Sequence, residues 1–107
     1  MQKLTTIEEF HSLTTEEKVI FFFTADWCSD CNFIKPVIPE IVEDHPEIQF
    51  IEVDRDQFLD LCGDLAVFGI PSFIAFENGH EVGRFVSKDR KTKAEIEAFI
   101  QSLDNLE

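Results

Sequence analysis

The sequence predicts an α/β fold in which one mixed sheet of four to five strands carries helices on both faces. Apolar runs of strand length alternate with segments of helical spacing, and that alternation implies parallel crossover connections. An Asn78-Gly79 turn late in the chain marks a hairpin, which adds an antiparallel edge. The length of 107 residues is typical of one domain, so we expect a single domain over residues 1–107.

The first half of the chain predicts a helix, a strand and a longer helix. Thr5–Glu9 contains overlapping capping boxes, so a short helix is expected to run through about His11. Lys18–Thr24 is apolar on both faces, as in a buried parallel strand. A helix over Cys28–Asp44 should kink at Pro36, because proline removes a backbone donor and clashes with the preceding turn.

The second half predicts three strands and two helices. The strands are expected at Ile48–Val53, Ser72–Phe76 and His80–Phe85. A short helix is expected over Asp56–Leu65, and the capping box Thr92–Glu95 opens a last helix that reaches Leu103.

The composition limits the classes of partner. The chain has 22 acidic and nine basic residues and a net charge of −13, which argues against nucleic acid and anionic membranes. No apolar stretch approaches the roughly 18 residues of a membrane span, and Met1–Thr6 has no apolar signal-peptide segment. We therefore expect a cytoplasmic protein, and a monomer.

Cys28 and Cys31 lie where the first predicted strand passes into a helix. A Cys-x-x-Cys pair in that position is a redox signature. Cys28 would meet the positive end of the helix dipole, which favours a thiolate, and Cys31 would lie one turn further on, toward the core. This asymmetry makes Cys28 the nucleophile and Cys31 the resolving thiol. A disulfide that closes so short a loop adds only about 2 kcal/mol, so redox use explains the spacing better than structural stabilisation.

The segment 25–31, Ala-Asp-Trp-Cys-Ser-Asp-Cys, resembles the active site of the thioredoxin family. The resemblance extends from about Ile7 to Leu103 and includes further motifs in the family's order, namely Pro36, Val53-Asp54, Gly69-Ile70-Pro71 and Asn78-Gly79. It implies a thioredoxin fold and a thiol–disulfide oxidoreductase. The activity it favours is that of a protein-disulfide reductase, which cycles a Cys28–Cys31 dithiol and disulfide through a mixed disulfide.

The resemblance also implies a substrate-binding surface and partners. Pro71 would be cis and would leave the backbone of Ile70 free to pair with an extended substrate, while Trp27 would shape the contact surface. The implied partners are disulfide-containing proteins and an electron donor of the thioredoxin-reductase type. Neither a metal nor an organic cofactor is implied, because the redox-active disulfide Cys28–Cys31 carries the chemistry.

The chain departs from the family pattern beside and beneath the cysteines. Ser29-Asp30 replaces the usual Gly-Pro, Phe22 stands where the family has a buried acid, and Phe50 stands where a lysine often pairs with that acid. Asp30 is therefore a candidate for proton transfer to and from Cys31, with Asp26 the less favoured alternative. Asp30 could instead tune the acidity of the thiols, since like charge disfavours a thiolate. A carboxylate with no catalytic role, which only caps the helix, is the simplest alternative.

Two other functions compete with the reductase. A thioredoxin-like binding or adaptor module with little turnover would explain the loss of the buried acid. A structural zinc site needs four ligands, and the sequence offers one close pair and the distant Cys62, which we expect to be a buried apolar residue.

The basic residues Lys88, Arg90, Lys91 and Lys93 are expected to form a solvated patch, and His11, His45 and His80 to lie on the surface.

Overall fold

A computed structural model describes residues 1–103 of the protein. Within them the strands are β1 (Gln2–Lys3), β2 (Val19–Thr24), β3 (Gln49–Asp54), β4 (Ser72–Glu77) and β5 (His80–Phe85). The helices are α1 (Ile7–Thr14), α2 (Ser29–Ile34), the 3₁₀ turn η1 (Lys35–Val37), α3 (Ile38–Asp44), α4 (Leu59–Asp64) and α5 (Lys93–Leu103). No helix in this part of the chain is long and apolar enough to span a membrane.

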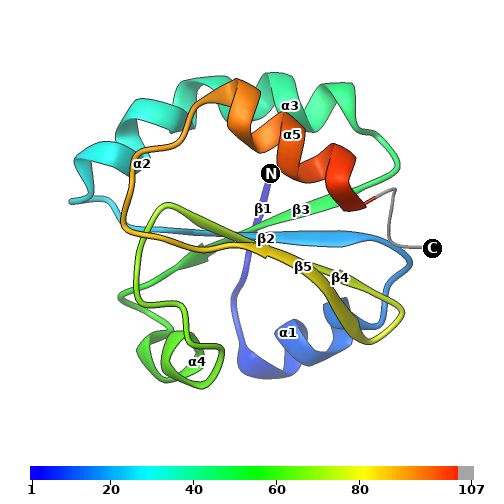
Figure 1. The fold of residues 1–107 in the computed structure, drawn as a ribbon. Coiled ribbons are helices and arrows are strands. Elements are labelled where there is room, and N and C mark those ends of the chain that lie inside the picture. The colour runs from blue at the N-terminus through cyan, green and yellow to red at the C-terminus, as the bar shows by residue number, and fades with distance from the viewer. Residues whose placement is uncertain (104–107) are drawn as a thin grey trace.

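The strands form one mixed sheet between two layers of helices (Figure 1). Their order is β1-β3-β2-β4-β5, in which β1, β3 and β2 run parallel while β4 and β5 pair antiparallel with their neighbours. Helices α2, α3 and α5 cover one face, and α1 and α4 cover the other. The predicted α/β architecture is confirmed.

The central strand β2 is buried along its whole length because it lies between two cores. Phe21 and Phe23 point into the core beneath α1 and α4, while Ile20 and Phe22 point into the core beneath α2, α3 and α5. Successive strand residues face opposite sides of a sheet, so an apolar run without alternation is what a doubly covered strand requires. Phe22 stacks on Phe73 of β4 with ring centroids 5.0 Å apart.

The helix expected over residues 28–44 is divided into α2, η1 and α3. Pro36 lies in the middle of the 3₁₀ turn, and Pro39 follows in the first turn of α3. Each proline lacks a backbone donor. The α-helical hydrogen bonding is therefore interrupted between α2 and α3, where the sequence predicted only a kink. The two helical halves still share one apolar face, through the buried Ile34 of α2 and Ile38 of α3.

Smaller differences occur at other element ends. Strand β1 was not predicted, because two residues are too few to show a pattern, and it pairs with β3 at the sheet edge. Helix α1 continues beyond His11 because Leu13 extends its buried side. Helix α4 begins at Leu59 rather than Asp56, because the chain turns after β3 through a bond from the Asp56 amide to the Asp54 carboxylate, 2.9 Å long.

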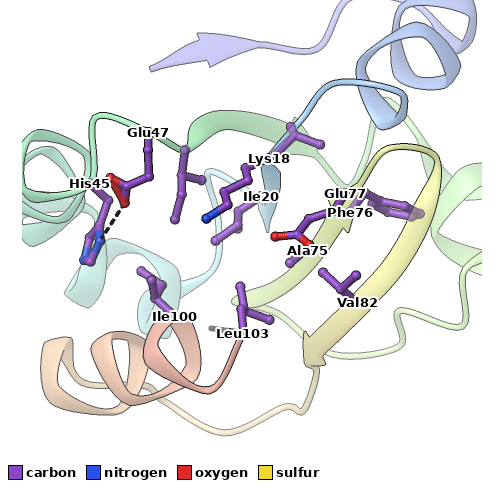
Figure 2. A pocket seen from close by; sticks show the side chains of 12 residues that line it. Lys18, Ile20, His45, Glu47, Ala75, Phe76, Glu77, Val82, Ile100 and Leu103 are labelled. Atoms are coloured by element: carbon purple, nitrogen blue, oxygen red, sulfur yellow. Dashed lines mark ion pairs between the residues drawn. The ribbon is translucent and has the colours of Figure 1, made fainter. Parts of the chain in front are cut away.

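His45 does not lie on the surface as expected, because it joins the end of α3 to α5. Its Nε2 lies 2.7 Å from a carboxylate oxygen of Glu97, and its Nδ1 lies 3.5 Å from Glu47. A small cavity of about 30 Å³ adjoins these residues. Figure 2 shows His45 and Glu47 among the side chains that line it. This cavity lies near the start of β2, at the opposite end of that strand from the cysteines, and no cysteine lines it.

Replacement of His45 with glutamine should remove a pH-dependent part of the stability. Burial alone would lower the pKa of His45, but the hydrogen bond and charge of Glu97, together with the charge of Glu47, raise it above 6.5. The stabilisation is therefore complete below about pH 6.5 and is lost as the pH rises through the folded pKa. We expect His45→Gln to cost about 1 kcal/mol at pH 5.5 and much less at pH 8.5, as measured by urea denaturation. Equal costs at both pH values would contradict this assignment.

Candidate active site

Cys28 occupies the N-cap of α2, directly beyond the loop that follows β2. Its Sγ accepts a hydrogen bond of 3.2 Å from the backbone N–H of Cys31. Cys28 is 7% exposed, whereas Cys31 is fully buried. Both are free thiols. Cys28 is therefore the outer sulfur of the pair, at the N-terminus of α2, and Cys31 is the inner one.

The buried position of Cys31 opposes its ionisation. Burial is the largest cause, and with the hydrogen bond to Cys28 it raises the pKa of Cys31 to about 11. The hydroxyl of Thr24 and the backbone of Ala25 act in the opposite direction. Cys31 is therefore a protonated thiol near neutral pH, and it must lose its proton before it can act as a nucleophile.

Ile70 and Pro71 pack directly against the cysteines. The Ile70–Pro71 peptide bond is cis, Pro71 is buried, and the Cys28 thiol lies 3.9 Å from the Ile70 carbonyl oxygen. Gly69 must be glycine, because a Cβ there would lie 2.5 Å from the backbone of Ser87. This close approach brings the segment after β5 against the segment before β4 at the edge of the site.

An open groove of about 370 Å³ adjoins Cys28. The residues lining it are Trp27, Cys28, Ser29, Asp30, Arg55, Val67, Phe68, Gly69, Ile70 and Lys88. Trp27 is 63% exposed and Phe68 is 80% exposed. The indole N–H of Trp27 donates a 2.7 Å hydrogen bond to Asp56, which holds the ring in place. Two large apolar side chains are thus presented to solvent beside a reactive sulfur.

The two acids considered for proton transfer differ in their surroundings. Asp30 accepts a 2.9 Å hydrogen bond from Arg90, and the Arg90 guanidinium lies 4.2 Å from the ring centroid of Phe33. Asp26 is fully exposed and lies 3.7 Å from the Lys35 ammonium. Asp30 lies in the first turn of α2, and its charge is balanced by Arg90 from the last fifth of the chain.

Lys91 is buried, contrary to the prediction of a solvated patch. It is 1% exposed, and its ammonium donates to the Asp89 carbonyl at 2.9 Å and to the Ser87 hydroxyl at 3.1 Å. It also lies 5.0 Å from the ring centroid of Phe85. Burial lowers the pKa of Lys91. Backbone oxygens and an aromatic face replace the water that a lysine normally keeps, and no local pattern in the sequence predicts such contacts.

Two phenylalanines occupy the positions where the family usually has a buried acid and its lysine partner. Phe22 and Phe50 both lie in the core beneath α2, α3 and α5, and no acid of β2 faces Cys31. Cys62 belongs to the opposite core, beneath α1 and α4, where burial raises the pKa of its thiol. It is buried as predicted. Within residues 1–103, no group of three or more His, Cys, Asp or Glu side chains is placed to hold a metal ion.

Comparison with known proteins identifies the family. The thioredoxin family model matches residues 2–102. Thioredoxin-2, mitochondrial, of Schizosaccharomyces pombe is 30% identical over 105 residues, which are 94% of this chain and 79% of the relative. Thioredoxin of Bos taurus is 34% identical over 88 residues, which are 82% of this chain and 81% of the relative. The crystal structure of thioredoxin from Trypanosoma brucei brucei has the same fold, with a TM-score of 0.85 at 21% identity over 96% of this chain and 89% of that one. A Cys-x-x-Cys pair at a helix N-terminus, a match over nearly the whole chain and these relatives together show that the chain belongs to the thioredoxin family.

Proposed function

We propose that this thiol–disulfide oxidoreductase reduces disulfide bonds in proteins, with Cys28 as the nucleophile and Cys31 as the resolving thiol. One observation carries the assignment of roles. The sulfur of Cys28 faces the groove and accepts the Cys31 N–H at 3.2 Å, while Cys31 is buried beneath it. Only the outer sulfur can meet a protein disulfide, and only the inner one is placed to attack the outer.

The two steps transfer two electrons to the substrate. The Cys28 thiolate attacks one sulfur of the substrate disulfide, the substrate S–S bond breaks, and the released sulfur takes up a proton. Cys31 then loses its proton and attacks the Cys28 sulfur. The mixed disulfide breaks, the second substrate sulfur leaves and takes up a proton, and a Cys28–Cys31 disulfide remains. The substrate is reduced to a dithiol, and the protein is oxidised.

The substrate would bind as an extended segment beside the cis peptide bond. Main-chain pairing with Ile70 would hold it, and Pro71 would keep that backbone in place. Trp27 and Phe68 offer apolar contact on either side of Cys28. Such contacts suit cystines that lie next to apolar residues, because aromatic side chains supply large contact areas at interfaces.

We propose that Asp30 tunes the reduction potential of the Cys28–Cys31 pair and does not take the proton of Cys31. Its carboxylate disfavours a nearby thiolate, and Arg90 offsets that charge at 2.9 Å. Removing the carboxylate with Asp30→Asn should stabilise the reduced form and make the reduction potential less negative. Removing the arginine with Arg90→Gln should have the opposite sign. We expect shifts of about 10–30 mV in glutathione equilibration. Shifts of the same sign in both variants would contradict this role.

The proposed partners follow from the same chemistry. Because the cycle ends in a disulfide, electrons must return from a reductase protein or a small dithiol, and the cysteine pair needs no other redox group. We propose that the chain acts as a monomer. The cytoplasm is the compartment we propose, with the mitochondrion as the alternative, because names of several relatives specify mitochondria.

Dithiothreitol-driven reduction of insulin tests this function. We expect catalysed precipitation of the reduced insulin chains at sub-stoichiometric protein, and a reduction potential near that of thioredoxins, about −270 mV. A variant with both active-site cysteines replaced by alanine is the control for non-catalytic effects. Turnover no faster than that control would favour the binding module, which the loss of the buried acid at Phe22 makes the second candidate.

A further inference from the structure

The resolving step requires a way for the buried Cys31 thiol to lose its proton. This requirement rests on the function proposed above, in which Cys31 attacks the Cys28 sulfur. Phe22, stacked on Phe73 in an apolar core, supplies no base, and Asp30 is paired with Arg90. The proton must therefore leave by another group that reaches the inner sulfur.

Thr24 is the polar side chain at that place. It is the last residue of β2, is 2% exposed, and has a buried hydroxyl oxygen with no formed hydrogen bond. Buried hydroxyls usually have a partner, and an oxygen that bonds no other protein group can bond a water molecule or the Cys31 sulfur. The hydroxyl lies close enough to the Cys31 sulfur to lower the pKa of that thiol, although no hydrogen bond is formed between them.

A cavity joins Thr24 to carboxylates on the neighbouring strand. It has a volume of about 120 Å³ and is lined by Lys3, Leu4, Thr24, Ala25, Asp26, Glu52, Asp54 and Gln57. Its size and polar lining allow it to hold water. In the parallel pairing of β2 with β3, Thr24 lies opposite Asp54 and Phe22 lies opposite Glu52. Paired residues of neighbouring strands share one face of the sheet. Glu52 and Asp54 of β3 therefore lie on the same face as Phe22 and Thr24, and either could supply the carboxylate that β2 lacks.

We propose that the Thr24 hydroxyl relays the proton of Cys31 through this cavity to Asp54. The Cys31 proton passes to the Thr24 oxygen, while the proton already on that oxygen passes outward through water to the Asp54 carboxylate. The hydroxyl then donates a hydrogen bond to the new Cys31 thiolate. Asp54 returns the proton to solvent or to the departing substrate thiolate. The protein thus loses the Cys31 proton, while Thr24 and Asp54 return to their starting protonation states.

Several other charged groups face the Cys31 thiol or the cavity, and they define the electrostatics of the path. Lys91 is buried within electrostatic range of Cys31, and Asp30 lies in the same turn of α2. Lys3, Asp26 and Glu52 line the cavity with Asp54. The side chain of Asp26 is fully exposed, and Glu52 lies 4.0 Å from the Lys3 ammonium. Asp54 is therefore the acid we assign, because its strand position is paired with that of Thr24.

Ellman's reagent separates the two chemical steps in a stopped-flow experiment. Attack by Cys28 releases the first thionitrobenzoate, and attack by Cys31 on the mixed disulfide releases the second. Every variant carries Cys62→Ala, so that only the active-site thiols react. Thr24→Val preserves the shape of the side chain and removes the hydroxyl, whereas Thr24→Ser retains the hydroxyl. Asp54→Asn removes the carboxylate but keeps the oxygen that accepts the Asp56 amide, and Asp44→Asn on the exposed end of α3 is its matched control.

We expect Thr24→Val to slow the second phase by roughly tenfold to a hundredfold, the range associated with a lost hydrogen bond to a charged group. The first phase should stay within about twofold, and the pH midpoint of the second phase should rise. Thr24→Ser should restore the wild-type second phase, while Asp54→Asn should slow it and Asp44→Asn should not. The melting temperature of Thr24→Val should change by no more than a few degrees, because the hydroxyl forms no hydrogen bond to another protein group.

The proposal would be overturned by a second phase within twofold of wild type in Thr24→Val, or by a Thr24→Ser variant as slow as Thr24→Val. An unchanged second phase in Asp54→Asn would remove Asp54 as the acceptor and overturn the outward path. Failure of the reductase function itself would look different, because the wild-type protein would then release only one thionitrobenzoate or none.

Discussion

Replacement of Cys28 with serine is expected to abolish disulfide reduction, with a loss of at least about a thousandfold in the insulin assay. Serine retains the size of the side chain but does not form the thiolate that attacks a disulfide. Cys31→Ser should behave differently, because Cys28 can still attack. We expect that variant to accumulate a stable mixed disulfide with insulin or another protein substrate, which intact-mass spectrometry will detect as a covalent adduct.

The matched control for this pair is Cys62→Ala. Cys62 is buried in the core beneath α1 and α4, so its replacement should leave turnover within about twofold and produce no adduct. An adduct that forms with Cys28→Ser instead of Cys31→Ser would reverse the two roles. Residual turnover in Cys28→Ser that disappears only when Cys62 is also replaced would place the nucleophile outside α2.

Phe22→Asp is expected to destabilise the protein strongly, although it restores the acid that the family usually carries there. Phe22 is fully buried in the core beneath α2, α3 and α5, where it stacks on Phe73 with ring centroids 5.0 Å apart. Removing a buried phenylalanine costs about 3–5 kcal/mol, and an unpaired carboxylate adds a burial penalty of several kcal/mol. We expect a loss of at least about 4 kcal/mol in guanidinium denaturation, a large share of the roughly 5–15 kcal/mol of a small domain.

Phe22→Leu separates the loss of volume from the burial of charge. Leucine keeps the site apolar, so we expect a loss of only about 1–2 kcal/mol. If Phe22→Asp were instead within about 1 kcal/mol of wild type, the site would already accommodate a charge, and the core beneath Cys31 would not be the apolar environment that requires a proton path through Thr24. The paired variants therefore test the environment beneath Cys31 without using activity.

Much of the fold could be predicted because its signals are local. The apolar run of β2, the capping box before α5 and the Asn78-Gly79 turn each depend on neighbouring residues, and all three agree with the structure. The strands predicted at residues 72–76 and 80–85 differ from β4 and β5 by one residue at most. The division of the helix after Cys31 was only half predicted, because a proline signals a disturbance without stating whether the helix bends or breaks.

The sequence by itself determined the chemistry of the outer sulfur, since two cysteines at a strand-to-helix junction place Cys28 at a helix N-terminus whatever surrounds it. Only the tertiary structure decided what lies beneath Cys31. Thr24 and Asp54 come from different strands and share a cavity because of their register, and Lys91 reaches the same region from the segment before α5. Burial and proton pathways depend on contacts between residues far apart in the chain, and such contacts leave no periodic trace in the sequence.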